Sequence, residues 1–320
     1  MASRTIEVTR VVLQGLIDSL TSRQVIVRFG RVKLLYYGLI VGLTMMLASV
    51  IISIVLQIFQ VPYQVIPYFI IFSIPSIAVV SRIFCSVVNF RKFLQDPAGF
   101  FRSTWFTYLG GYLGLFFSCM FVAMYHDVDL LRFSDAVMLF LPLIHLVGRI
   151  ASINYGCCGI GMRQEKGGLH FIYDGDAKVA GQGLGDQKLI PVHLYEMAAN
   201  LGLFFLVLTV FLLVPLHGLV SAVYMTGYGL IRFLIEPYRH EPNKIGRYSL
   251  YQILLTTVFV LYGIGYFVAG LYFQTPVFMD FNIQYLYNIL AYFHVILIMG
   301  LVAMLLFGIR LEEISAAKTG

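Results

Sequence analysis

The chain has 320 residues, of which 59% are hydrophobic and only 12% are charged. Ordinary soluble domains are roughly 45–50% apolar and about 25% charged, so a soluble protein with a single core is excluded. The net charge is +6, but no soluble segment interleaves basic and aromatic residues, and no nucleic-acid partner is expected. The excess of Lys and Arg is typical of the flanks of membrane spans.

Apolar stretches long enough to cross a bilayer recur along the chain, because about 20 helical residues span roughly 30 Å of hydrocarbon. We expect eight spans, at residues 34–59, 65–88, 105–125, 134–152, 196–214, 218–236, 249–273 and 285–309. The predicted fold class is an all-α polytopic membrane protein embedded in the lipid bilayer. One long glycine-rich loop, residues 153–195, is expected to form a subdomain outside the membrane.

Residues 1–33 precede the first span and contain six basic side chains. Apolar positions between residues 6 and 20 recur at roughly helical spacing, which indicates either an amphipathic helix on the membrane surface or a loose terminal helix. Three units are therefore expected. They are a basic amphipathic segment at 1–33, a membrane domain at 34–273, and an additional C-terminal helix and tail at 274–320.

Basic residues are unevenly shared between the two ends of the predicted bundle. Eighteen lie in the N-terminal segment, the second, fourth and sixth loops and the tail, whereas the alternate loops contain only Arg132. Because Lys and Arg are retained on the cytoplasmic side, both termini and the long loop are predicted to face the cytoplasm.

Three arginines, Arg82, Arg149 and Arg232, lie inside predicted spans. An arginine at the bilayer centre costs at least about 2.5 kcal/mol, so it persists where it faces protein or water. Interior ion pairing or snorkelling from the end of a span would also explain each of them. Two arginines on separate helices suit a lipid phosphate, because a guanidinium group bonds phosphate oxygens in pairs.

Two polar helical faces surround these arginines, since residues three or four apart share one side of a helix. The faces consist of Tyr228, Arg232 and Glu236 in the sixth span and of His145, Arg149 and Ser152 in the fourth.

Glycines and one acidic residue complete the candidate set. Gly110 and Gly111 in the third span allow close approach of either a second helix or a ligand. Glu196 is expected in the first turn of a helix, where it either interacts with the helix dipole or contributes to a site. The histidines and cysteines have no metal-ligand spacing, so no metal or cofactor is expected.

Seven short motifs occur in a particular order along the chain. They are Tyr37-Gly38, Ser81-Arg82, Gly110-Gly111-Tyr112-Leu113-Gly114, Gly148-Arg149-Ile150 followed by Gly156-Cys157-Cys158, Pro191-Val192-His193-Leu194-Tyr195-Glu196, Tyr228-Gly229 with Arg232 and Glu236, and Ser249-Leu250-Tyr251-Gln252. This order, from Phe29 to Phe273, resembles the prolipoprotein diacylglyceryl transferase family of bacterial inner membranes.

The resemblance implies an enzyme of the bacterial plasma (inner) membrane with two substrates. It would transfer a diacylglyceryl group from phosphatidylglycerol to the lipobox cysteine of a prolipoprotein and release glycerol 1-phosphate. The expected catalytic residues are Arg149, Arg232, Glu236, Tyr228 and His145. The expected substrate-binding residues are Tyr37, Arg82, Gly110, Gly111, Ser152, Gly156, Tyr195 and Glu196.

This sequence departs from the family pattern at functionally important places. Leu109 stands where the family has a histidine before its two glycines, and Ala151 replaces the closing glycine of Gly-Arg-Ile-Gly. We hypothesise that His145 or His193 supplies the missing imidazole, although an ordinary packed or capping histidine explains each. The span at 285–309 is additional to the family's usual seven.

Membrane orientation is a second departure, because family members are expected to place the loop before the fifth span on the outer face. Two other functions therefore stay open from the sequence. One is a diverged lipid-group transferase with another acceptor at the cytoplasmic face, and the other is a non-catalytic lipid-binding membrane protein.

Overall fold

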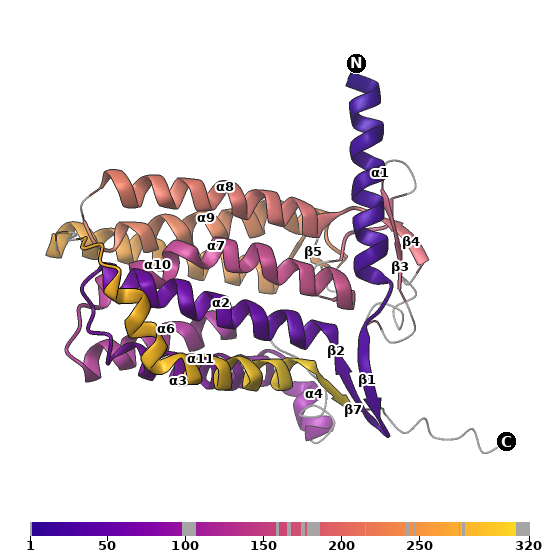
Figure 1. The fold of residues 1–320 in the computed structure, drawn as a ribbon. Coiled ribbons are helices and arrows are strands. Elements are labelled where there is room, and N and C mark those ends of the chain that lie inside the picture. Colours follow the sequence, from indigo (N-terminus) through magenta and orange to yellow (C-terminus); the bar gives the residue numbers. More distant parts are fainter. Residues whose placement is uncertain are drawn as a thin grey trace.

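The computed structural model describes residues 2–97, 107–157, 160–164, 168–173, 177, 186–214, 216–240, 244–245, 247–274, 276 and 279–311. Long helices lie side by side in one bundle (Figure 1). They are α2 (Tyr36–Ile58), α3 (Ile66–Val88), α6 (Tyr108–Tyr125), α7 (Leu130–Tyr155), α8 (Val192–Leu213), α9 (Leu219–Ile235), α10 (Leu250–Phe273) and α11 (Gln284–Gly308).

Seven helices in the described part of the chain are long and apolar enough to cross a membrane. The predicted all-α polytopic class is therefore confirmed. The shorter apolar helix α6 lies in the predicted span 105–125, whose first two residues fall outside the described ranges. The expected count of eight spans stays a prediction.

The other helices and the strands gather at one end of the bundle (Figure 1). They are α1 (Ala2–Thr21), α4 (Phe90–Gln95), a 3-10 helix at Glu236–Tyr238, β1 (Val25–Phe29), β2 (Val32–Leu35), β3 (Leu169–Ile172), β4 (Asp186–Leu189), β5 (Lys244–Ile245), β6 (Tyr248–Ser249) and β7 (Ile309–Leu311). The β3–β4 hairpin lies in the long loop, of which only part is described.

Strand β2 pairs with strands from both ends of the chain. It is antiparallel to β1 and also to β7, with Val32 opposite Leu311 and Leu34 opposite Ile309. Strands of three to five residues are too short to show a clear alternation of apolar and polar positions, and the sequence pattern did not predict them.

Helix α1 lies across the direction of the bundle helices (Figure 1). Its Ile17 is buried against the β3–β4 hairpin, and the Asn154 amide at the end of α7 donates to the Leu20 and Arg23 carbonyls at 2.7 and 2.8 Å. Val12 and Leu16 are exposed on the helix. This two-sided pattern fits the expected amphipathic helix, and its location on a membrane surface stays a prediction.

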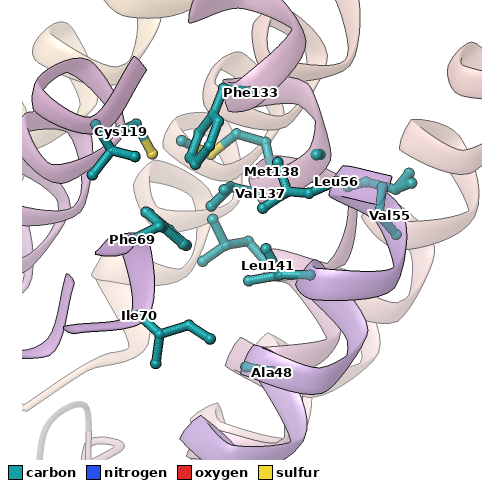
Figure 2. Close-up of a cluster of buried hydrophobic side chains, with 14 of the residues drawn as sticks. Ala48, Val55, Leu56, Phe69, Ile70, Cys119, Phe133, Val137, Met138 and Leu141 are labelled. Atoms are coloured by element: carbon teal, nitrogen blue, oxygen red, sulfur yellow. The ribbon is translucent and has the colours of Figure 1, made fainter. Parts of the chain in front are cut away.

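Helix α7 contributes densely packed apolar side chains to the centre of the bundle. Phe133, Val137 and Met138 pack against Leu56 of α2 and Phe69 of α3 (Figure 2). The Phe133 and Phe69 rings meet edge to face with centroids 5.1 Å apart. Dense packing fixes the helix axis, so α7 holds the polar residues of its last two turns in place.

Helices α2 and α11 approach through glycines. A Cβ atom added to Gly38 would collide with the Gly308 backbone, and one added to Gly42 would lie 2.8 Å from the Gly300 carbonyl oxygen. At the other end of the pair, the Asn288 amide donates to Gln57 Oε1 at 2.7 Å. Backbones this close leave no space for side chains.

We expect Gly38→Val to destabilise the fold by about 2 kcal/mol, because the added side chain must push α2 and α11 apart. Thermal unfolding of the detergent-solubilised protein measures the effect. Gly202→Ala in α8 is the matched control, since nothing lies within 4 Å of a Cβ there. A stability loss in Gly202→Ala equal to that in Gly38→Val would contradict close packing as the cause.

Candidate functional site

A buried ionic cluster lies where the ends of α7, α8 and α9 meet. Arg149, Arg232 and Glu196 are only 7%, 4% and 1% exposed. The Glu196 carboxylate lies between the two arginines: Oε2 pairs with the Arg149 guanidinium group and Oε1 accepts from the Arg232 guanidinium group. We call these three residues the Arg–Glu–Arg cluster. Its two cations and one anion leave a formal excess of one positive charge.

Local structure explains why Glu196 reaches both arginines. Pro191 is the N-cap residue immediately before α8, so Glu196 lies near the start of that helix. Arg232 lies in the last turn of α9, and its guanidinium group also approaches Gln252 Oε1 of α10 at 3.4 Å. A buried charge needs a partner and further hydrogen bonds, and the three helix ends together supply them.

Glu236 lies at the end of α9, in the turn that leads to α10. It accepts from the Ser249 hydroxyl at 2.9 Å and pairs with Arg239 at 3.4 Å. Ser249 also caps α10 by accepting from the Gln252 backbone N–H at 3.2 Å. Glu236 therefore connects the end of α9 to the start of α10, which carries Gln252 toward Arg232.

Three tyrosines surround His145 in the bundle interior. The Tyr112 hydroxyl lies 2.9 Å from His145 Nε2, the Tyr224 hydroxyl lies 3.2 Å from Nδ1, and these two hydroxyls contact each other. The Tyr228 ring lies 4.8 Å from the imidazole, centroid to centroid. This group, the His–Tyr cluster, joins α6, α7 and α9.

Sequence reasoning assigned no role to Tyr112 or Tyr224. Tyr224 precedes Tyr228 by four residues, so extending the face of Tyr228 and Arg232 by one turn would have found it. Tyr112 follows the two glycines of α6, and only the packing of α6 against α7 and α9 brings it to His145.

Leu109 is buried near the start of α6, and its backbone N–H donates to the Tyr251 hydroxyl at 3.1 Å. The glycine that follows it serves helix packing: a Cβ on Gly110 would lie 2.6 Å from Ser81 Cα, whereas one on Gly111 would make ordinary contact with Ile77. Helix packing therefore accounts for Gly110.

Other expected site residues lie around the clusters rather than in them. The Tyr37 ring packs against the Tyr155 ring with centroids 5.6 Å apart, and Gly156 ends α7 in a left-handed conformation with φ +60°. The Ser152 hydroxyl donates to the Gly148 carbonyl at 3.4 Å. His193 Nε2 lies 3.2 Å from the Cys157 carbonyl oxygen.

Two expected site residues lie in different surroundings. Tyr195 is 50% exposed, unlike its buried neighbour Glu196. Arg82 lies on α3, in the wall of a groove formed with α4 and α11. Cys158, the second residue of the cysteine pair, lies outside the described residues.

The bundle and its clusters define a multi-pass membrane protein with a buried Arg–Glu–Arg cluster at one end. A family model for prolipoprotein diacylglyceryl transferase matches residues 24–269. The chain belongs to that family, which is one of transferases. The match ends before α11, so this helix lies beyond the family segment.

Individual relatives have modest identity. The chain is 27% identical over 199 residues to the phosphatidylglycerol–prolipoprotein diacylglyceryl transferase of Chlorobaculum tepidum, covering 56% of this chain and 65% of the relative. The Aeromonas hydrophila enzyme of that name is 27% identical over 189 residues, covering 57% and 65%. The Clostridioides difficile enzyme is 25% identical over 186 residues, covering 58% and 70%. The chain thus spans less than two thirds of the first two relatives.

Proposed function

We propose that this chain transfers the diacylglyceryl group of phosphatidylglycerol to a prolipoprotein cysteine in the bacterial inner membrane. The thiol loses its proton, and the sulfur attacks the carbon of the diacylglyceryl unit that is bonded to the phosphate oxygen. A C–S bond forms, the C–O bond breaks, and glycerol 1-phosphate leaves with the bonding electron pair. The names of the relatives support this choice of donor and acceptor.

The Arg–Glu–Arg cluster is the observation that carries the proposal. A leaving phosphate ester develops negative charge, which fixed cations stabilise most strongly where water is excluded. Glu196 orients both guanidinium groups and cancels only one of their two charges. The remaining positive charge suits the oxygens of the phosphate, which guanidinium groups bond strongly.

The His–Tyr cluster is our candidate for the group that accepts the thiol proton, because a thiolate is the reactive form of cysteine. His145 lies one helical turn from Arg149, so a proton held on its ring is near the charge that forms. Tyr228 packs on the imidazole and fixes its orientation. Glu236 acts as a positioning residue, because it holds the segment that carries Gln252 and Arg232 together.

The direct test is to incubate the purified full-length chain with phosphatidylglycerol vesicles and a lipobox peptide. Mass spectrometry should detect a diacylglyceryl adduct on the peptide cysteine, together with released glycerol 1-phosphate. A peptide with serine in place of the cysteine, and vesicles of phosphatidylcholine alone, are the controls. Absence of the adduct, with failure to complement a transferase-depleted strain, would refute the proposal.

We expect His145→Ala to lower the transfer rate about 10²-fold, the usual effect of losing a general base, and to change the pH dependence of the rate. His193→Ala is the comparison, because His193 contacts a backbone carbonyl, and it should lower the rate only a few-fold. If His145→Ala keeps the rate and pH profile of the parent protein, His145 has no part in proton transfer.

Orientation is tested by reporter fusions after residues 100 and 170. The distribution of Lys and Arg predicts that both sites lie on the cytoplasmic side. A cytoplasmic reporter should therefore be active at both positions, and a periplasmic reporter should be silent. Activity of the periplasmic reporter at both positions would reverse the predicted topology.

A further inference from the structure

A groove of about 600 Å³ lies along α3, where α4 and the end of α11 meet it. It is distinct from the Arg–Glu–Arg cluster, which is built from α7, α8 and α9. Its walls are mostly apolar side chains. They include Val79, Ile83, Val87, Phe90, Phe93 and Leu306.

The spacing along α3 explains this lining. Val79, Ile83 and Val87 follow one another at intervals of four residues, so they form one outward stripe of the helix. All three are exposed in the protein. The stripe lies on a span that is long and apolar enough to cross the membrane, where lipid chains are its natural surroundings.

One cation interrupts this apolar lining. Arg82 is the only charged side chain among the described residues that line the groove. It lies six residues before the end of α3 at Val88, or about 9 Å along the helix axis. At that depth a guanidinium group reaches the layer of phosphates while its neighbours contact acyl chains.

A second arginine increases the positive charge near the groove. Arg310 of β7 is close enough to Arg82 for their charges to interact. Its own position is fixed, because its Nε donates to the Tyr155 hydroxyl at 3.3 Å and its guanidinium group lies over the Tyr155 ring. Like charges held near each other favour an anion between them or beside them.

We propose that this groove binds one anionic phospholipid, with its phosphate at Arg82 and its apolar part against the apolar side chains that surround Arg82 in the groove. An apolar wall with a cation inside it matches a phospholipid, which has both apolar chains and a phosphate. A soluble anion would make no use of the apolar side chains. Leu306 and Arg310 come from α11 and β7, beyond the family segment.

Helix α3, which carries Arg82, contacts the start of α6, and α6 carries Tyr112 of the His–Tyr cluster. This contact is made by Ser81, the neighbour of Arg82: its hydroxyl donates to the Thr107 carbonyl at 2.7 Å and accepts from the Thr107 N–H at 2.8 Å. We infer that phosphatidylglycerol occupies the groove before it reaches the Arg–Glu–Arg cluster. Only this last step depends on the proposed function.

Lipid binding to the full-length protein is measured by native mass spectrometry in detergent titrated with phosphatidylglycerol or phosphatidylcholine. The parent protein should retain phosphatidylglycerol preferentially. Arg82→Gln should bind it about tenfold more weakly, the usual loss of a charged hydrogen bond, and Arg82→Lys should recover part of the preference. Val87→Trp should block both lipids, whereas Val88→Trp, on an exposed neighbour outside the groove, should bind as the parent does.

The same variants distinguish this inference from the proposed function. In the transfer assay Arg82→Gln and Val87→Trp should raise the KM for phosphatidylglycerol with little change in kcat. Lipid binding that responds to both variants in a chain that transfers nothing would support the groove and refute the function. Unchanged binding and unchanged KM in both variants would show that Arg82 only snorkels, and would overturn the groove while leaving the function intact.

Discussion

Arg232→Ala is expected to lower diacylglyceryl transfer about 10³-fold, because removing one preorganised group that stabilises developing charge costs that much in other enzymes. Arg232→Lys should restore only a small part of the rate. A lysine keeps the charge but loses the planar fork that bonds a carboxylate and a phosphate together. The measurement is the initial rate of peptide modification at saturating phosphatidylglycerol.

Arg132→Ala is the matched control for this prediction. Arg132 lies on α7 as Arg149 does, but 17 residues earlier, which is about 25 Å along the helix axis. Its replacement should leave the rate within a few-fold of the parent value. Equal losses in Arg132→Ala and Arg232→Ala would indicate general damage to the protein and would remove the evidence for a phosphate-binding cluster.

Variants of the Arg–Glu–Arg cluster must be tested for folding as well as for activity, since each residue of the cluster is buried. Glu196→Ala leaves two buried arginines without their shared carboxylate, and breaking a buried ion pair in this way costs about 3–5 kcal/mol. Size-exclusion profiles and thermal unfolding should therefore show a less stable Glu196→Ala protein. A fully active and fully stable Glu196→Ala variant would be incompatible with the role given to the carboxylate.

Asp135→Ala is expected to give the largest loss of stability outside the ionic cluster. Asp135 is 1% exposed, and its carboxylate accepts from the Gly218 N–H at 2.7 Å, the Ser221 N–H at 2.8 Å and the Ser221 hydroxyl at 2.6 Å. It thereby caps the start of α9 from a neighbouring helix. Leaving these donors buried and unsatisfied should cost about 3 kcal/mol or more.

Asp129→Ala offers a comparison with a second aspartate cap. Asp129 begins α7 and accepts from the Arg132 N–H at 2.8 Å, but it is only partly buried. Its loss should cost about 1 kcal/mol, the usual value for an N-cap. Thermal unfolding of both variants in the same detergent measures the difference. Similar losses in the two variants would show that burial of the Asp135 cap adds nothing.

The helices that span the membrane were predictable, because length and hydropathy decide them locally. Burial of Arg149 and Arg232 was also predictable, since a charge inside an apolar span must face protein or water. That Glu196 joins both arginines depends on how three helix ends meet, and sequence spacing contains no information on contacts between helices. For the same reason, the contact between Tyr112 and His145 could not be predicted from the sequence.

The strands and the groove could not be predicted for a different reason. Strand β7 has three residues, and it acquires its conformation only by pairing with β2 near the other end of the chain. Arg82 was recognisable as an unusual residue, but its surroundings include Leu306, more than 200 positions away in the sequence. Long-range pairing of this kind is decided by the fold and not by local pattern.

The packing of α2 against α11, next to the pairing of β2 with β7, has a consequence for biosynthesis. Among the described spans, helix α2 leaves the ribosome first, yet its glycine-lined partner α11 is made last. Until α11 emerges, the face of α2 that carries Gly38 contacts only lipid or a transient binding partner. Final assembly of the bundle therefore waits until α11 has been translated, so termination before α11 would leave an inserted bundle without this helix.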